Sequence, residues 1–401
     1  MKSSQDQGLA LSGVRILDLS RVLAGPWATQ MLGDLGAEII KVEQPGKGDD
    51  TRTWGPPWHG DGDDRLSGYY LSCNRNKKSV VIDMAKPEGQ DLIRQLALQS
   101  DVVVENFKLG GLKKYGLDYA SLGAADPRLI YCSITGFGQS GPRAAQPGYD
   151  FMIQGMSGFM SITGDPSTEP QRAGVAVTDV MTGLHAVIAI LAALNQRHAT
   201  GRGQYIDLAL FDVAVSVLAN QALNYLVSGE VPVRMGNAHP NVIPYQAFAT
   251  LDGHLILAVG NDAQFARFMA LTDLPEWGED ERFRTNAARI AHRPVLIPQV
   301  ARIMAGRTTV DWTELLTKHG IPHGPINSIA QALADPQAKH RGLATQAGSR
   351  PAIASPLRLS DSPAPPASAP PRLGADTDEV LAALCGLDAD MLADLRARGV
   401  L

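Results

Sequence analysis

Cysteine is scarce in this 401-residue sequence, and its three cysteines lie far apart. Cys73, Cys132 and Cys385 form no CxxC pair and no Cys/His cluster, so neither a disulfide framework nor a metal site is expected. Each is better explained as a small hydrophobic core residue than as a nucleophile.

Long runs of one charge are also missing. The net charge is −5 with no basic or acidic block, which argues against nucleic acid or an anionic membrane surface as the main partner. The N-terminus MKSSQDQGLA has no apolar signal core, and the longest apolar helical stretch, 184–194, is too short to span a bilayer. We therefore expect a cytoplasmic protein.

The usual nucleotide-binding motifs are absent as well. The loop after the first predicted strand reads SRVLAGPWATQ, without GxGxxG, and GxxxxGK[ST] occurs nowhere in the sequence. The sequence therefore lacks the motifs that are typical of a nicotinamide dinucleotide site and of a P-loop phosphate site.

Strands and helices alternate over the first 140 residues. Apolar strands are predicted at 14–20, 37–43, 79–84, 101–107 and 129–138, and the intervening segments include helices at 26–35 and 87–99. This alternation predicts an α/β fold, a Rossmann-like large domain with a mostly parallel sheet covered on both faces. Ligands of such sheets bind at the carboxyl ends of the strands.

The remainder of the chain predicts a smaller α+β domain. A long apolar helix around 184–194, a strand in 200–210 and a second long helix at 211–229 complete the first domain. A hairpin at 247–260 turns at DG, and short amphipathic helices follow it. The proline-rich segment 362–374 is expected to be extended and to lead to a last helix. The predicted domains are 1–215, 216–325, and 326–401, a linker and C-terminal segment returning to the large domain.

Asp179 is the most informative single residue, because it precedes a helix that is apolar on every face. The simpler interpretation is a helix cap, since aspartate accepts backbone N–H bonds at a helix start. The functional interpretation makes its carboxylate a nucleophile or proton shuttle, and the two are compatible. Two interpretations also stay open for Asp150, Asn106 and Lys108. They are either turn or strand-end residues, or they contact a ligand. The loop MGNAHPN (235–241) is either a connection or a lid.

Together these segments resemble the class III CoA-transferases (the CaiB/BaiF family), which include formyl-CoA and carnitine CoA-transferases and alpha-methylacyl-CoA racemases. The likeness covers nearly the whole chain, from LSGVRILDLSRVLAGPWATQMLGDLGAEIIKVE through CNRNKKSVVIDMAKPEG, VVVENFKLGGLKKYGLD, SITGFGQSGP, YDFMIQGMSGFMSITG and TGRGQYIDLALFD to LGADTDEVL. The resemblance implies interlocked homodimers of ring-like chains that use acyl-CoA without a metal.

The resemblance also implies residue roles. The family's aspartate nucleophile corresponds to Asp179, which would form an anhydride and then an aspartyl-CoA thioester. A substrate loop would include Gly236, Asn237 and His239. The implied CoA contacts are Leu23, Ala24, Gln44, Ile82, Asp83, Met84, Ala85, Asn106, Phe107, Lys108, Lys114, Tyr149 and Asp150.

Departures from the family pattern bear on the substrate. Leu23 and Gln44 stand where formyl-CoA:oxalate enzymes have glutamine and arginine, which disfavours oxalate as acceptor. MGNAHPNVIPYQAF is closer to the branch that uses succinyl-CoA and dicarboxylic acids. Arg21, Arg52 and Arg75 are alternative partners for a distal carboxylate.

Two other functions stay open. A racemase would need a histidine where this sequence has Tyr149, and a tyrosine with an ordinary pKa of about 10 is a poor replacement. A non-catalytic CoA-binding protein would have no need of Asp179. We therefore predict an acyl-CoA:carboxylate CoA-transferase, with succinyl-CoA as the favoured donor and a small carboxylic or dicarboxylic acid as acceptor.

Overall fold

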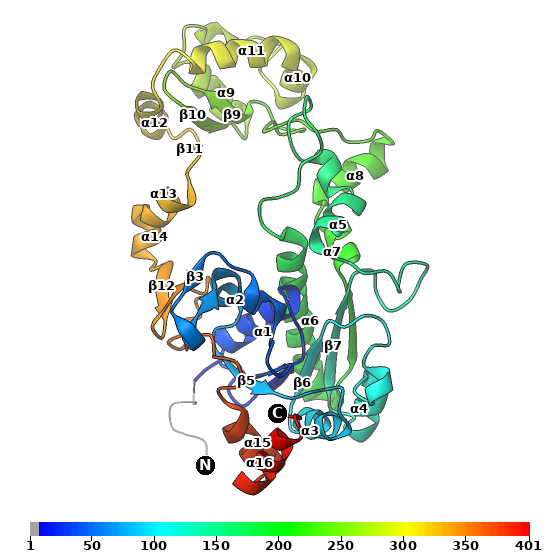
Figure 1. The fold of residues 1–401 in the computed structure, drawn as a ribbon. Helices are drawn as coiled ribbons and strands as arrows, with labels where there is room; N and C mark the ends of the chain where they lie inside the picture. Colours follow the sequence, from blue (N-terminus) through cyan, green and yellow to red (C-terminus); the bar gives the residue numbers. More distant parts are fainter. Residues whose placement is uncertain (1–7) are drawn as a thin grey trace. The chain divides into compact units, whose positions relative to one another are not determined.

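The structure is a computed structural model of residues 1–401, described for residues 8–401 except the side chain of residue 63. Residues 1–7, on which the signal-sequence argument partly depends, lie outside the described range. The chain divides into two compact units (Figure 1). Unit 1 contains the chain up to Phe159, Ala173–Leu223 and Pro336–Leu401, and unit 2 contains Met160–Arg172 and Asn224–Asp335. These units are defined by contacts and not by independent folding, so the domain boundaries predicted at residues 215 and 325 stay predictions.

Unit 1 is built on a six-stranded parallel sheet. Its strands are β1 (Arg15–Asp18), β2 (Glu38–Glu43), β5 (Lys77–Val81), β6 (Val102–Glu105), β7 (Ile130–Thr135) and β8 (Tyr205–Ala209). They lie in the order β5-β2-β1-β6-β7-β8, and each neighbouring pair is parallel. The predicted α/β fold with a parallel sheet is confirmed. The strand order reverses between β1 and β6, and ligands of open α/β sheets bind at such a point.

Helices cover both faces of this sheet. One face is covered by α1 (Ala24–Asp34), α5 (Asp150–Met156), α6 (Val177–Thr200) and α7 (Leu210–Ser216), and the other by α3 (Pro87–Leu98), α4 (Tyr119–Ala125), α15 (Thr377–Cys385) and α16 (Ala389–Ala397). Unit 1 also contains α2 (Gly68–Cys73) and α14 (Pro336–His340). Ile16 and Val104 pack on the side of α1 and α6, whereas Leu17 and Val103 pack on the side of α3 and α15. Because alternate residues enter opposite cores, the central residues of β1 and β6 are apolar on both faces.

Three helix predictions are wrong in detail. The helix predicted at 184–194 extends over 24 residues, Val177–Thr200, because Gly183 does not interrupt it and Gly201 ends it in the left-handed conformation. The helix predicted at 211–229 is two helices, α7 and α8 (Ala219–Ser228), separated by a bend at Ala219 with φ of 47°. The last predicted helix, α15, is followed by α16.

The length of α6 also corrects the expectation about membranes. By length and composition α6 could cross a membrane, and the bent pair α7–α8 could count as a second such segment among the described residues. A buried core helix meets the same criteria, and Ala186, Ile190 and Ala193 of α6 are buried in the core against the sheet.

Unit 2 has its own sheet and core. Strands β9 (Tyr245–Ala249), β10 (His254–Ala258) and β11 (His323–Pro325) form an antiparallel sheet in the order β11-β10-β9. Its helices are α9 (Asp262–Met269), α10 (Asn286–Ala291), α11 (Arg293–Met304), α12 (Thr309–Lys318) and α13 (Ile329–Ala334). The predicted hairpin, which turns at Asp252 and Gly253, is confirmed.

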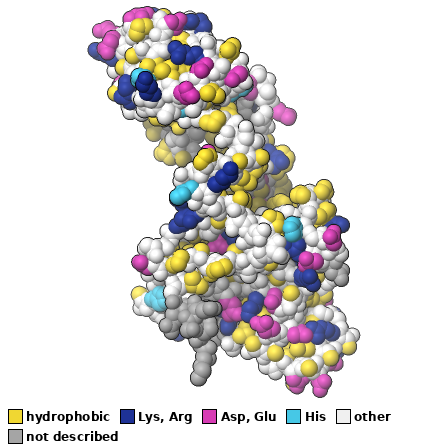
Figure 2. Space-filling model, turned by 90° about the vertical axis from the view of Figure 1, so that its left-hand side faces the viewer, with side chains coloured by type: hydrophobic (Ala, Val, Ile, Leu, Met, Phe, Trp, Pro, Cys, Tyr) yellow, Lys and Arg dark blue, Asp and Glu magenta, His cyan; other side chains and the backbone are white. Residues whose placement is uncertain are grey.

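Shorter elements complete unit 1. Two small antiparallel pairs are β3 (Trp58–His59) with β4 (Leu66–Ser67) and β12 (Ala344–Ala347) with β13 (Arg350–Ile353). A 3-10 turn, η1 (Asp50–Thr53), follows β2, and a second, η3 (Lys113–Tyr115), follows β6. The proline-rich segment contains no helix or strand between Pro363 and Pro371, as predicted. On the face drawn in Figure 2, basic and acidic side chains are interspersed.

Candidate active site

Asp179 is the third residue of α6 and caps nothing. The helix begins at Val177, and the side chain of Asp179 makes no hydrogen bond within the described part of the chain. The prediction that Asp179 caps its own helix is therefore wrong. A capping residue precedes the first turn of its helix, whereas Asp179 lies inside the first turn of α6. Burial, and then the nearby charge of Asp150, raise its pKa to about 7.

Asp150, at the start of α5, supplies the missing cap. Its Oδ1 accepts hydrogen bonds from the backbone N of Thr178 at 2.8 Å and from the Thr178 hydroxyl at 2.6 Å, with the N of Asp179 at 3.4 Å. Its Oδ2 accepts from Gln154 Nε2 at 2.7 Å, and Gln154 Oε1 accepts from Ala173 N at 2.9 Å. Asp150 thus satisfies the orphan amides of α6 and leaves the Asp179 carboxylate uncommitted.

Helix α1 packs against α6 close to Asp179. Gly183 lies one turn after Asp179, and a Cβ there would be 2.8 Å from the backbone O of Ala24 and 3.0 Å from the Trp27 ring. Only glycine allows this approach. The contact brings the loop between β1 and α1, including Leu23 and Ala24, to the helix that carries Asp179.

A cavity of about 210 Å³ lies at the carboxyl ends of β1, β2, β5 and β6. Six of the predicted CoA contacts line it: Gln44, Ile82, Asp83, Met84, Ala85 and Phe107. Arg21 and Tyr115 line it too. Residues from four separate segments therefore meet at the sheet edge where the strand order reverses, which is where the fold predicts a ligand.

The other predicted contacts lie elsewhere in unit 1. Leu23 and Ala24 are buried at the start of α1, and Tyr149 is 70% exposed. Lys108 lines a second cavity of about 340 Å³, shared with Phe107, and Lys114 lies over the Tyr115 ring at 4.4 Å. The amide of Asn106 bonds to the backbone of Arg21.

The predicted substrate loop belongs to unit 2. Gly236 N donates to Gly164 O at 3.1 Å, and His239 N donates to Tyr245 O at 3.0 Å. The His239 ring lies 5.4 Å from the Tyr245 ring. Asn237 is exposed.

The structure separates the three candidate arginines. Arg52 pairs with Glu43 through two nitrogens at 2.7 and 2.8 Å. Arg75 pairs with Asp34 in the same bidentate way and is 8% exposed. Arg21 makes a longer contact of 3.4 Å with Asp50, and both side chains are half exposed. Arg21 is therefore the one of the three whose charge can reorganise around a ligand at low cost.

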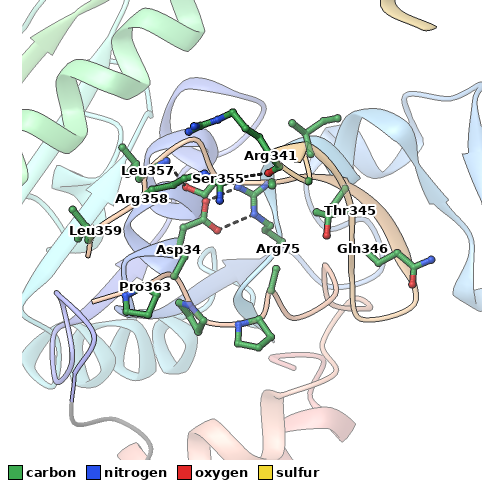
Figure 3. Close-up of a pocket in the computed structure, with 18 of the residues that line it drawn as sticks. Asp34, Arg75, Arg341, Thr345, Gln346, Ser355, Leu357, Arg358, Leu359 and Pro363 are labelled. Carbon is green, nitrogen blue, oxygen red and sulfur yellow. Dashed lines mark hydrogen bonds and ion pairs between the residues drawn. The ribbon is translucent and has the colours of Figure 1, made fainter. Parts of the chain in front are cut away.

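Another cavity, of about 800 Å³, is lined by neither Asp179 nor Asp150. It surrounds the Asp34–Arg75 pair and is closed by the extended segment that includes Leu357, Arg358 and Pro363 (Figure 3). Apart from Arg75, none of the predicted site residues lines it.

Two residues near the site carried no recognisable sequence signal. Tyr69 packs edge-on against Trp54, and burial and then the charge of Asp179 raise the pKa of Tyr69 to about 12. Asp49 is 1% exposed and pairs with the fully buried Lys41 at 2.9 Å. A buried ion pair formed from a loop residue and a strand residue leaves no periodic pattern.

Comparison with known proteins gives consistent results. The sequence model of CoA-transferase family III matches residues 11–377. A succinate–glutarate CoA-transferase of Agrobacterium fabrum is 50% identical over 93% of this chain and 95% of its own length. The human succinyl-CoA:glutarate CoA-transferase is 43% identical over 97% of this chain and 89% of its own. A crystal structure of a CaiB/BaiF family protein from Brucella suis, 50% identical, superposes with a TM-score of 0.85 over 94% of this chain and all of its own.

Proposed function

This chain belongs to CoA-transferase family III, and we propose that it moves coenzyme A from succinyl-CoA to glutarate or a dicarboxylic acid of similar length. The names of the relatives support the substrate pair. The observation that carries the reaction is Asp179, a carboxylate at the start of the partly buried helix α6, with no side-chain hydrogen bond within the described residues and a pKa raised to about 7.

The proposed chemistry is a covalent exchange at Asp179. Its carboxylate attacks the thioester carbonyl, which gives a mixed anhydride and CoA thiolate. The thiolate then attacks the aspartyl carbonyl, which releases the donor acid and leaves an aspartyl-CoA thioester. The acceptor carboxylate attacks that thioester, and the thiolate finally attacks the acceptor carbon of the new anhydride and restores Asp179. A thioester is exchanged for a thioester, so the overall reaction needs no external energy source.

The surroundings of Asp179 suit this role. A carboxylate stabilised by strong hydrogen bonds is a weak nucleophile, and Asp150 takes over the capping bonds that would otherwise weaken Asp179. The raised pKa reflects poor solvation of the anion, which makes it more reactive once it is charged. Helix α1 starts at Ala24 without a side-chain cap, and we propose that the amides of Ala24 and Gly25, the only N–H groups before Pro26, stabilise the oxyanion.

The cavity at the sheet edge is the proposed CoA site. The loop 82–85 and Phe107 line it, and Arg21 lies over the Phe107 ring at 5.4 Å. A guanidinium in this position suits the phosphates of CoA, because arginine binds phosphate through several parallel hydrogen bonds. We assign Arg21 to the phosphates and not to the acceptor acid.

Self-association and location complete the proposal. We propose an interlocked homodimer of ring-like chains, each with a smaller α+β domain, in the cytoplasm. Large apolar side chains are exposed on α5 and α6, with Phe151 at 58% and Ile188 at 64%, and such surface commonly marks an interface. Light scattering after size-exclusion chromatography tests this, and an active monomer would contradict it.

The decisive experiment follows the covalent intermediate. Purified protein is incubated with succinyl-CoA and a panel of carboxylic acids, and new thioesters are identified by mass. Hydroxylamine attacks the aspartyl-CoA thioester, releases CoA and leaves a hydroxamate on the enzyme, which peptide mass spectrometry locates. We expect glutaryl-CoA to form and Asp179 to be labelled, and Asp179→Asn to abolish both. Asp212→Asn, which changes an exposed acid in the first turn of α7, is the matched control.

The same experiment distinguishes the alternatives. A racemase would exchange the proton alpha to the thioester with deuterium from the solvent, without labelling Asp179. A CoA-binding protein would bind succinyl-CoA without forming any product. Either result would refute the transferase.

A further inference from the structure

We infer that Asn106 and Asp49 are positioning residues that hold the loop Ser20–Val22 in the shape required for acyl transfer. This inference rests on the proposed function. It concerns a loop whose backbone is held, at the N–H and the C=O of all three residues, by side chains from five other places in unit 1.

Ser20 is fixed from the strands below it. Its N donates to Asp18 Oδ1 at 2.9 Å, and its O accepts from Lys41 Nζ at 2.8 Å. Asp18 and Lys41 are both fully buried, on β1 and β2. The first residue of the loop is therefore tied to the sheet itself.

The backbone of Arg21 is held by a residue that follows β6, on the other side of the point where the strand order reverses. Its N donates to Asn106 Oδ1 at 2.9 Å, and Asn106 Nδ2 donates to its O at 2.7 Å. Asn106 follows the end of β6, so one amide side chain joins the loop after β1 to the loop after β6. Both polar groups of that amide bond to the backbone of Arg21, so Asn106 fixes the N–H and the C=O of this residue.

Val22 is the strained residue of the three. Its φ of 71° lies in the left-handed region, which is unusual for a β-branched side chain. Its N lies 3.2 and 3.3 Å from the two carboxylate oxygens of Asp49, and its O lies 3.6 Å from the Cys73 thiol. Such a conformation persists only where the surroundings determine it.

Asp49 is itself held rigidly. Lys41 Nζ donates to it at 2.9 Å, and the N and hydroxyl of Thr51 donate at 3.0 and 2.8 Å. Lys41 thus bonds both the O of Ser20 and the carboxylate that holds Val22. A single buried ammonium therefore connects the two ends of the loop.

The loop leads directly to the chemistry. It continues into Leu23 and Ala24, and the O of Ala24 lies against Gly183, one turn after Asp179. A shift of about 1 Å in this backbone would move the start of α1 relative to Asp179, and misplacement of that size costs up to about 100-fold in rate. The same loop carries Arg21 into the cavity proposed for CoA.

Asn106 offers the sharper test, because it is partly exposed and carries no buried charge. For Asn106→Ala we expect kcat to fall about 10- to 100-fold, with the KM for succinyl-CoA within about 3-fold of the natural enzyme. Asn106→Asp keeps the acceptor for Arg21 N but loses the donor to Arg21 O. Its kcat should therefore lie between those of the natural enzyme and Asn106→Ala. Asn195→Ala, an exposed change on α6, is the control.

Amide hydrogen exchange supplies a readout that does not depend on activity. The amides of Arg21 and Val22 should be protected in the natural protein, and Asn106→Ala should lose the protection of Arg21. A rise in KM alone would make Asn106 a CoA contact and overturn the inference, as would unchanged exchange. If the natural protein proves inactive, the proposed function fails, and exchange alone still decides whether the loop is held.

Discussion

A carboxylate with a raised pKa makes both activity and stability depend on pH. The folded protein holds the proton of Asp179 up to about pH 7, whereas the unfolded chain releases it near the ordinary value of 3.8. The contribution of Asp179 to stability is therefore most favourable below pH 4 and is lost as pH rises to about 7.

The first prediction concerns this linkage. Asp179→Asn should be more stable than the natural protein at pH 8 by about 2 kcal/mol, less than the shift alone implies because solvent reaches part of the group. The difference should vanish near pH 4. Thermal unfolding at both pH values measures it, and equal stabilities at pH 8 would show that Asp179 is well solvated.

The second prediction concerns the reaction rate. Because attack requires the ionised carboxylate, kcat/KM for succinyl-CoA should rise with pH and level off above about 7. A flat profile between pH 5 and 8 would mean that Asp179 is already ionised throughout this range.

The third prediction separates Arg21 from the reacting centre. Arg21→Ala should raise the KM for succinyl-CoA about 10-fold, because a phosphate contact is lost. Succinyl-pantetheine has no phosphates, so its kinetics should not change. Arg21→Lys should recover part of the loss, and Arg202→Ala is an exposed control. Equal effects on both substrates would place Arg21 at the acyl group or the acceptor.

At the scale of residues, the sequence singled out Asp179 as a candidate but did not show its environment. An acidic residue before an apolar helix can be recognised in the sequence. Its expected hydrogen-bond partners are then the first amides of that same helix. The actual cap, Asp150, lies 29 residues earlier, and such a bond has no local signature. For the same reason neither Asp49 nor the doubly bonded amide of Asn106 could be recognised before the strands were placed side by side.

At the scale of elements, the contact between α1 and α6 governs the site. The two helices approach closely because Gly183 has no side chain, and the O of Ala24 lies 2.8 Å from the position that a Cβ would take. The apolar period of each helix predicts that it is buried, but it does not predict which helix it meets. Likewise the bend at Ala219 is marked by no proline or glycine in the sequence 211–228.

The fourth prediction tests that contact. Gly183→Ala should force α1 and α6 apart, which should destabilise the fold by about 1–3 kcal/mol and lower kcat. Gly174→Ala, where a Cβ would meet nothing within 4 Å, is the matched control and should behave like the natural protein. Unfolding curves and kcat are measured for both, and an active, fully stable Gly183→Ala would show that the helices can move without cost.

At the scale of the whole molecule, the chain forms two units, and each unit contains segments that are not consecutive in the sequence. Alternating strands and helices predicted the parallel sheet, and a hairpin signal predicted the antiparallel one. The segment Met160–Arg172 joins unit 2 although it is embedded in the sequence of unit 1. Its contacts, such as Arg234 Nη2 to Thr168 O at 2.8 Å, join residues 66 positions apart, and no local pattern could have shown them.

The last prediction follows from the separate core of unit 2. Trp312 is 1% exposed, packs near Phe268 and donates its indole N–H to Met304 O at 2.8 Å. Trp312→Ala should destabilise unit 2 by about 3–5 kcal/mol, because a large cavity and an unpaired carbonyl remain. Since units with their own cores can unfold separately, calorimetry should show an added transition at lower temperature, with proteolysis confined to Asn224–Asp335. Trp54→Ala, at a 45% exposed position, is the control for stability. A single transition that moves as a whole would mean that the two units unfold together.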